Sequence, residues 1–362
     1  MRTLIPVLLG ALLLGTASGR AELGKLNLPD GFQIRIVTDA VGNARQMALA
    51  ADGTLFVGSW TRGNVYAVPK ALTSERPEVI VLAEGLPLPS GVTERNGDLY
   101  VAALNRVLRF PAIAEQLAPG ANYQVVTDRL PDIRHHGWKY LKFGPDGRLY
   151  LPVGAPCNMC LSEDPRFATI MSMDPASGDT EIVARGVRNS IGFDWHPSTR
   201  QLWFTDNGRD LLGDDVPPEE VNVLTESGQH FGYPFVHATA ILDPDFGGDA
   251  DPADYVPPVV EIQAHSAALG VDFYTGEQFP ERYRNALFIA EHGSWNRSGK
   301  VGYQISVIVF DGDEPSYEPF ITGWLQGQVN WGRPSDVLAA PDGSLLIAED
   351  QKGVIYQVTW SG

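Results

Sequence analysis

Two adjacent histidines, His135 and His136, stand at the start of a stretch that otherwise predicts an ordinary β-hairpin, RHHGWKYLKFGPDGRLYLPVG. Imidazole has an ordinary pKa close to neutral pH, so a histidine placed beside a substrate can act as a general base. The plain alternative is that both rings only make hydrogen bonds at the foot of a strand. The choice depends on where the neighbouring elements place the two rings.

The hairpin that follows the histidines is one of six similar segments along the chain. Each is a turn followed by an apolar and aromatic strand, and the matching leucines are Leu55, Leu99, Leu149, Leu202, Leu287 and Leu345. Short strands that recur with a period of about 50 residues are typical of a β-propeller. A pair of β-sandwiches would leave the sixfold repeat unexplained.

We therefore predict an all-β fold with a single domain, residues 22–362, built as a six-bladed β-propeller of four-stranded antiparallel blades. The sixth repeat reaches the C-terminus after three strands, whereas the strand FQIRIVT at residues 32–38 has no blade of its own. We expect this N-terminal strand to join the C-terminal blade, because closing the ring removes the open sheet edges.

The order of strands in such a blade puts the crossovers into each innermost strand, and the loops between second and third strands, on one face. Five of the six crossovers carry Arg or His, namely Arg45, His135 with His136, Arg188, His265 and Arg333. Any one of them could simply bond a neighbouring blade. Five around one axis predict a central pocket for a polyanionic or polar ligand.

The same face should receive the loop TDNGRDLLGDDVPPEEVN of the fourth blade. It carries six carboxylates, Asp206, Asp210, Asp214, Asp215, Glu219 and Glu220. Oxygen-rich clusters with glycine for tight turning suit Ca²⁺, although a solvated acidic surface explains most of these residues equally. A second acidic segment, residues 243–255, is expected toward the opposite face, as a solvated insertion or a metal site.

The composition excludes some partners and indicates a compartment. Lys and Arg number 27 against 44 Asp and Glu, a net charge of −17, which makes nucleic acid and anionic membranes poor partners. Residues 1–21 have the positive start, apolar run and small residues of a secretory signal peptide. We expect a secreted protein of the bacterial periplasm without a membrane anchor. Its two cysteines, Cys157 and Cys160, then form a local disulfide or remain two buried thiols.

Blocks along nearly the whole chain after the leader resemble the soluble glucose/sorbosone dehydrogenases, six-bladed propellers that bind pyrroloquinoline quinone (PQQ) and Ca²⁺. The blocks include HHGWKYLKFGPDGRLY, GVRNSIGFDWHP, FTDNGRDLLGDDVPPEEVN, AHSAALGVDFYTG, EHGSWNR and WGRPSDVLAAPDG. The branch with the greatest similarity is the L-sorbosone/aldose sugar dehydrogenase group. The resemblance implies a PQQ-dependent oxidoreductase that oxidises aldose sugars or related hydroxy or aldehyde compounds. Its electrons would pass to a soluble acceptor, a quinone or a cytochrome.

The resemblance also assigns roles to residues. It makes His136 the catalytic base for the anomeric hydroxyl while hydride passes to the quinone C5, and alternation along the strand would turn His135 away. The predicted cofactor contacts are Arg188 and Asn189 near the quinone oxygens, Arg333 at a PQQ carboxylate, and Asn158 and Arg297. The predicted calcium ligands are Gly208 and Arg209, through their carbonyls, with Glu219 and Glu220.

Some positions depart from the family pattern. The lysine with which glucose-oxidising members contact PQQ is replaced within EHGSWNR, so Arg297 or His292 would have to substitute for it, and a second family arginine falls on Ser335. Two other functions therefore stay open. One is a Ca²⁺-dependent propeller lactonase, which predicts a cage of carboxylate and Asn ligands on the axis. The other is a periplasmic binding propeller without catalysis.

Overall fold

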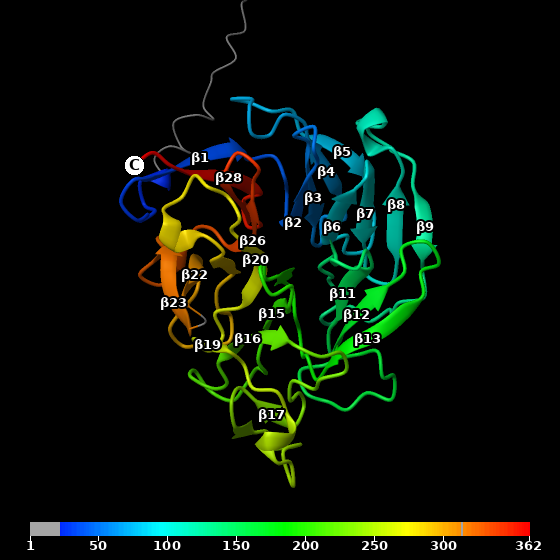
Figure 1. The fold of residues 1–362 in the computed structure, drawn as a ribbon, viewed down its shortest axis with the longest axis vertical. Coiled ribbons are helices and arrows are strands. Elements are labelled where there is room, and N and C mark those ends of the chain that lie inside the picture. Colours follow the sequence, from blue (N-terminus) through cyan, green and yellow to red (C-terminus); the bar gives the residue numbers. More distant parts are fainter. Residues whose placement is uncertain (1–21, 313) are drawn as a thin grey trace, which may run out of the picture.

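The computed structural model describes residues 22–312 and 314–362 and shows six four-stranded antiparallel sheets arranged in a ring (Figure 1). The predicted six-bladed β-propeller is confirmed. The predicted signal peptide, residues 1–21, lies outside the described residues. In the described part of the chain, no helix has the length and apolar character needed to cross a membrane.

Each blade takes its strands in chain order from the axis outward, except the last. Blade 1 holds β2 (Ala44–Leu49), β3 (Leu55–Ser59), β4 (Val65–Val68) and β5 (Ile80–Ala83); blade 2 holds β6 (Gly91–Arg95), β7 (Asp98–Ala102), β8 (Val107–Phe110) and β9 (Gln124–Thr127); blade 3 holds β10 (Lys142–Phe143), β11 (Leu149–Val153), β12 (Thr169–Met173) and β13 (Thr180–Arg185). Blade 4 holds β14 (Phe193–Trp195), β15 (Leu202–Asp206), β16 (Glu219–Leu224) and β19 (Val260–Ile262); blade 5 holds β20 (Ala268–Phe273), β21 (Leu287–Glu291), β22 (Gln304–Asp311) and β23 (Glu314–Ile321); blade 6 holds β26 (Pro334–Ala339), β27 (Leu345–Glu349), β28 (Val354–Trp360) and β1 (Phe32–Thr38).

The ring is closed by the N-terminal strand, as predicted. Strand β1 pairs antiparallel with β28, with Phe32 opposite Trp360 and Ile36 opposite Tyr356. Figure 1 shows the blue β1 beside the red β28, so the two ends of the chain share one blade. This pairing gives the last blade its fourth, outermost strand and ties the N-terminal segment to the C-terminal one.

The repeated leucine explains why the six segments look alike. It lies in the second strand of its blade and is fully buried in five blades, at Leu55, Leu99, Leu149, Leu287 and Leu345, while Leu202 is 3% exposed. In each case it belongs to an apolar cluster between neighbouring sheets. An apolar side chain at this place is what lets adjacent blades pack face to face.

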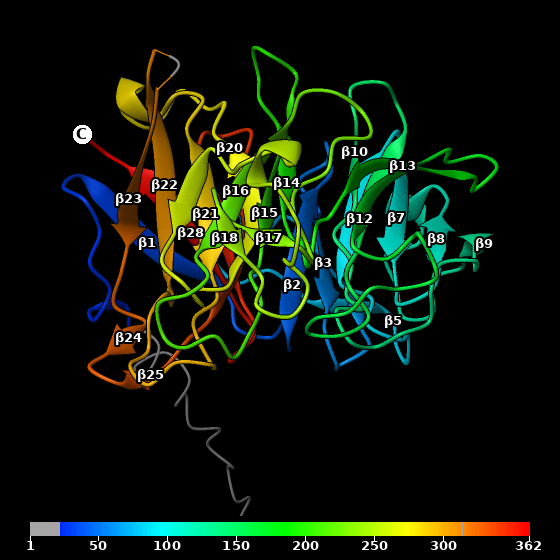
Figure 2. The same ribbon diagram turned by 90° about the horizontal axis from the view of Figure 1, so that it is seen from below.

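Five short elements of the described chain lie outside the four-stranded blades. The 3-10 turns η1 (Ile113–Glu115), η2 (Pro252–Asp254) and η3 (Glu281–Tyr283) lie in connections, as do two short hairpins, β17 (Val236–His237) with β18 (Ile241–Leu242) and β24 (Leu325–Gln326) with β25 (Val329–Asn330). The first hairpin projects from the rim of the ring in Figure 1, and Figure 2 shows the second at one face.

We expected residues 243–255 to lie toward the opposite face, and for the first residues of this segment, Asp243 and Asp245, that expectation is wrong. Arg209, in the loop after β15, forms ion pairs with Asp243 at 2.5 Å and Asp245 at 3.2 Å. The connection from β16 to β19 is long enough to turn back along blade 3, where His230 forms an isolated parallel β-bridge with Arg185. The acidic segment therefore begins at the pocket side and neutralises an arginine there.

A polar network surrounds the axis on the inner strands. Lys142 of β10 donates to Asp194 of β14 at 2.7 Å and to Asp272 of β20 at 2.5 Å. Asp336 of β26 is buried beside them and lies 3.5 Å from the hydroxyl of Tyr140. Three carboxylates thus converge on one ammonium, so the network has an excess of negative charge when all are ionised.

Replacing Asp272 with Asn should stabilise the protein relative to wild type more strongly at about pH 8 than at about pH 5. Burial raises the pKa of Asp272 to about 7, despite the opposing effect of Lys142, with further repulsion from Asp194. The folded state therefore binds the extra proton between 3.8 and about 7, so wild-type stability falls as pH rises through this range, and the loss is complete above about 7. Thermal unfolding of both proteins across this range measures the difference. A difference that does not change with pH would contradict the prediction.

Candidate functional site

A cavity of about 590 Å³ opens at the start of the innermost strands, and we refer to it as the axial cavity. Its lining comes from blades around the ring: Arg45, Trp60, Arg134, His135, His136, Trp138, Arg188, Asn189, Asn207, Gly208, Asp210, Glu219, His265, Ala267, Leu269, His292, Gly293, Trp295 and Arg333. The Arg and His residues predicted from the crossovers are all among them. The structure thus brings together residues far apart in the sequence, such as Arg45 and Arg333. The hydrogen bond from the Met47 amide to Asp336, 289 positions away, joins the first and last blades in the same way.

The two histidines lie at the wall of the axial cavity, outside any strand. Their ring centroids are 4.1 Å apart, and His136 has a left-handed backbone with φ of 48°. The expectation that strand alternation turns His135 away from the axis is wrong, because alternation applies only within a strand. Both rings line the cavity.

His136 is held in one protonation form by its surroundings. Its Nδ1 lies 2.9 Å from the carbonyl oxygen of Ala155, which can only accept a hydrogen bond. Nδ1 therefore carries the proton, and Nε2 has a free lone pair. Burial, followed by the nearby charge of Arg188, holds the pKa of His136 well below its ordinary value. The ring is neutral at pH 7 and able to accept a proton.

A carboxylate fixes the backbone beside this base. Asp206, at the end of β15, accepts the amide protons of Arg188 at 2.7 Å and Asn189 at 2.6 Å. Arg188 is buried, and its Nη2 pairs with Asp210 at 3.0 Å. The Arg-Asn pair at the crossover into blade 4 is therefore rigidly presented to the cavity.

Several buried polar atoms of the cavity wall lack a hydrogen-bond partner among the residues that the structure describes. They are Asn189 Oδ1, Arg45 Nε and Trp138 Nε1. Arg333 donates to the carbonyls of His292 at 3.1 Å and Gly293 at 2.8 Å, and no carboxylate of the described residues pairs with it. Buried polar groups without a partner are costly, so this wall is suited to a ligand that supplies negative charge and acceptors to the N–H groups and a donor to Asn189 Oδ1.

Four predicted site residues do not line the cavity. Arg297 donates to Asp215 at 2.7 Å and to the carbonyl of Asp214, and so bridges two loops. The side chain of Arg209 points to Asp243 and Asp245. Glu220 accepts from Ala238 at 2.7 Å on the other side of β16 from Glu219, and Asn158 contacts Arg188.

The predicted calcium set is therefore only partly at the cavity, through Gly208 and Glu219. Glu219 already accepts the amide protons of Gly208 at 2.6 Å and Ala267 at 3.1 Å. Burial raises its pKa to about 7. Among the residues that the structure describes, no group of three or more His, Cys, Asp or Glu side chains is arranged to hold a metal ion.

Cys157 and Cys160 form a disulfide, so the first of the two alternatives for these cysteines holds. The bridge closes a short loop after β11, at the same face as the axial cavity. Asn158 lies inside this loop.

Sequence reasoning missed three tryptophans of the cavity wall, Trp60, Trp138 and Trp295. Trp60 directly follows β3, and Trp295 lies four residues after β21. An alignment of the six repeats at their leucines would have shown that residues just after the second strand face the cavity in several blades. Asn207 and Gly208 occupy the same place after β15.

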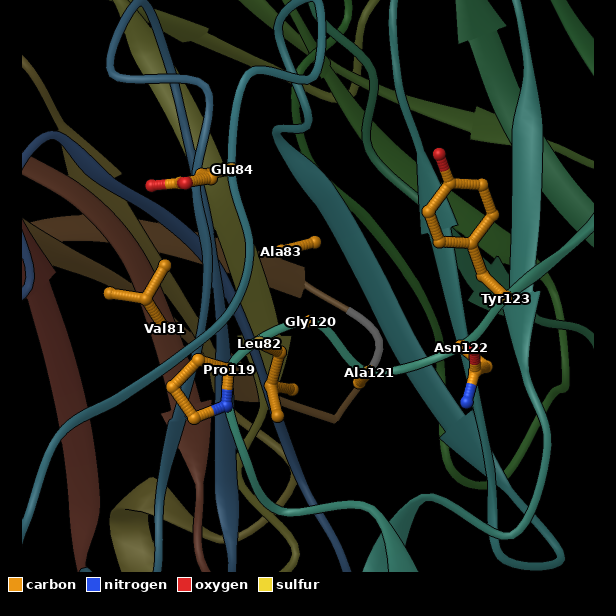
Figure 3. A pocket seen from close by; sticks show the side chains of 9 residues that line it. All are labelled: Val81, Leu82, Ala83, Glu84, Pro119, Gly120, Ala121, Asn122 and Tyr123. Atoms are coloured by element: carbon orange, nitrogen blue, oxygen red, sulfur yellow. The ribbon is translucent and has the colours of Figure 1, made fainter.

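A separate hollow of about 490 Å³ lies at the outer side of blades 1 and 2 (Figure 3). It is lined by residues 81–84 and 119–123, chiefly apolar side chains and backbone. Among these nine residues Glu84 is the single carboxylate, and it is exposed. This composition offers no group for catalysis.

Fold and site together define a six-bladed propeller with a cationic axial pocket and a neutral histidine in its wall. The profile of the glucose / sorbosone dehydrogenase family matches residues 102–357. The chain belongs to this family.

The chain is also similar to other proteins in sequence and in fold. An uncharacterized protein of Borreliella burgdorferi is 33% identical over 349 residues, which cover 92% of this chain and 90% of that protein. The holo form of the pyranose dehydrogenase PQQ domain from Coprinopsis cinerea superposes with a TM-score of 0.76, at 17% identity over 92% of this chain and 97% of that one. The PQQ-bound aldose sugar dehydrogenase from Streptomyces coelicolor gives 0.64, at 19% identity over 92% and 100%. These two likenesses show the shared fold.

Proposed function

We propose that this protein is a PQQ-dependent dehydrogenase of aldose sugars or related hydroxy or aldehyde compounds. The observation that carries the proposal is the presence, in one cavity, of Arg333, which has no carboxylate partner among the described residues, and of a neutral His136 whose Nε2 can accept a proton. Arg45 and Arg188 line the same cavity, each paired with one aspartate. We place the protein in the periplasm, with a soluble acceptor, a quinone or a cytochrome taking the electrons. Family membership and the PQQ-bound neighbours support the proposal of a PQQ-dependent dehydrogenase.

The residues of the axial cavity fit PQQ. PQQ is an o-quinone with three carboxylates, and Arg45, Arg188 and Arg333 present guanidinium groups to the space it would fill. The unpartnered Asn189 Oδ1 and Trp138 Nε1 add polar contacts at the same wall. Bound PQQ supplies a two-electron acceptor for substrate hydride.

The chain itself supplies the proton chemistry. His136 Nε2 accepts the proton of the substrate hydroxyl, and the Ala155 carbonyl keeps the ring in the tautomer that can do so. The positive charge of Arg188 disfavours a second proton on the ring before substrate arrives. The exposed Trp295 and half-buried Trp138 give the sugar apolar surfaces at the cavity wall.

A divalent cation fits this wall less completely. Gly208 offers a main-chain carbonyl, and Glu219 with Asp210 offers carboxylates that favour a hard cation. We propose the main-chain carbonyls of Gly208 and Arg209 and the carboxylate of Glu219 as the calcium ligands, and we place Glu220 behind them in support of β16. A lactonase would need a fuller cage of carboxylates on the axis, where the structure instead presents arginines.

Cofactor-free protein should oxidise aldoses only after PQQ and Ca²⁺ are both added. The reason is that the cavity wall contains a base and binding groups but no side chain that accepts hydride. Dye-linked oxidation of a panel of aldoses, with and without chelator, measures the dependence, and the quinone absorbance reports binding. Full activity in chelator without PQQ would contradict the proposal. Tight PQQ uptake without oxidation of any sugar would favour the binding propeller.

Replacing Arg333 with Ala should weaken PQQ binding about 10- to 100-fold, since a charge-assisted hydrogen bond is worth about 1.5–3 kcal/mol. Arg333 has no carboxylate partner in the described chain, so its charge is available to the cofactor. Fluorescence titration with PQQ measures the affinity. Arg282→Ala is the matched control, because Arg282 is exposed and pairs with Glu318 away from the cavity. Equal affinities in the two variants would place the cofactor elsewhere.

A further inference from the structure

The disulfide loop lies beside the arginine that forms one wall of the axial cavity. Cys157 and Cys160 are three positions apart, with their Cα atoms 6.2 Å from each other, and they enclose Asn158 and Met159. The loop connects β11 to β12 at the face that carries the cavity. Cys157, Asn158 and Cys160 are all half-buried, so the bridge is within reach of a small reductant.

Asn158 makes four hydrogen bonds across the boundary between blades 3 and 4. Its carbonyl accepts from Arg188 Nε at 3.0 Å, and its Oδ1 accepts from Arg188 Nη2 at 2.8 Å. The same Oδ1 accepts the amide proton of Asp210 at 2.9 Å, while Nδ2 donates to the carbonyl of Asp210 at 3.1 Å. Asn158 thus holds both the guanidinium of Arg188 and the backbone of Asp210, the ionic partner of Arg188.

Arg188 therefore depends on the disulfide loop for its orientation. Its other side-chain contacts are Nη1 to the carbonyl of Asn207 at 2.9 Å and the ion pair with Asp210. Asp210 is itself held by Asn158. A guanidinium that is fixed in this way meets an anion at little further cost in conformational entropy.

Few other contacts hold the loop in place. Residues 161–163, which follow the bridge, are exposed, with Leu161 at 63%. Apart from the bonds of Asn158, the loop is attached through Tyr233, whose hydroxyl accepts the amide proton of Cys160 at 3.1 Å. The covalent bridge adds a restraint on the backbone on both sides of Asn158, and so on the conformations from which its four hydrogen bonds form.

We propose that the Cys157–Cys160 disulfide is a positioning element of the cofactor site, acting through Asn158 on Arg188. Transfer of two electrons and two protons from a dithiol would break the S–S bond, give two thiols and a cyclic disulfide of the reductant, and loosen Arg188. PQQ affinity would then depend on the redox state of the loop. The inference rests on the proposed function, because it takes PQQ as the anion that Arg188 meets.

The test compares oxidised wild type with the double variant Cys157→Ser/Cys160→Ser and with dithiol-reduced wild type. PQQ should bind both bridge-free forms about tenfold more weakly, the lower range for loss of a group that orients a ligand-binding side chain. Asn158→Ala should cause a similar loss, and adding it to the double variant should cost little more, since both changes act on one residue. Hydrogen exchange at the Asp210 amide should speed up in the bridge-free forms.

A general structural role would lower the unfolding temperature without these specific effects, so thermal unfolding is measured in parallel. Equal PQQ affinities in oxidised wild type and the double variant overturn the inference and leave the proposed function intact. Fully additive losses from Asn158→Ala and the double variant also overturn it. Failure of oxidised wild type to bind PQQ overturns the proposed function and this inference together. Arg282→Ala again serves as the control that should change neither affinity nor exchange.

Discussion

Replacing His136 with Asn should lower kcat for aldose oxidation by about 100- to 10,000-fold, the usual contribution of a positioned general base. Asn is the suitable replacement because it tolerates the left-handed backbone of this position, φ 48°, better than Ala does. PQQ affinity should fall far less, since the arginines of the cavity remain. Steady-state kinetics at saturating PQQ, with a parallel PQQ titration, separate the two effects.

His265→Asn is the matched control for this experiment. His265 also lines the axial cavity and has a positive φ, 68°, but its Nε2 lies 2.8 Å from the carbonyl of Gly213. It therefore has no free lone pair at that nitrogen, and its replacement should cost much less in kcat. If replacing His135 or His265 with Asn lowers kcat as much as His136→Asn does, or more, the base is assigned to the wrong ring.

The fold could be predicted because its signal is repeated. The same leucine position fills the space between adjacent sheets in each blade, so six weak local patterns reinforce one another. The strand at residues 32–38 had no blade of its own, and the sixth blade lacked one strand. In the structure this strand, β1, pairs with β28 of the sixth blade. The turn of residues 243–255 toward the pocket could not be predicted in this way. It depends on contacts such as Arg209 with Asp243, which join segments that share no repeat.

The site could be predicted only at the level of which segments meet. Crossovers into the innermost strands must surround the axis, so Arg45, Arg188 and Arg333 converge whatever their rotamers are. Which side chain then faces the cavity depends on local backbone conformation and on partners. His135 lines the cavity because the chain turns at His136, and Arg297 is drawn away by Asp215. Neither effect leaves a periodic trace in the sequence.

The axial network of Lys142, Asp194, Asp272 and Asp336 joins the inner strands of four blades. Lys142 is the ammonium toward which Asp194 and Asp272 point, at 2.7 and 2.5 Å, and Asp336 lies close by. Burial raises the pKa of Asp336 well above its ordinary value, with Asp272 adding repulsion. Where the carboxylates are ionised, Lys142 is the ammonium that compensates their charge.

Lys142→Met should accordingly destabilise the protein by about 3 kcal/mol, the lower end of the cost of breaking a buried ion pair, because a quarter of the lysine side chain stays exposed. Met keeps most of the apolar stem, so the loss reports the charge. The loss should shrink at about pH 5, where protonation of Asp272 relieves the repulsion, and should shrink again in Lys142→Met/Asp272→Asn at neutral pH. Denaturant unfolding of the three proteins measures these differences.

Lys352→Met, which removes the partly exposed pair with Glu22, should cost under about 1 kcal/mol at any pH. A Lys142 variant as stable as the Lys352 variant would show that the carboxylates are already neutral in the folded ring.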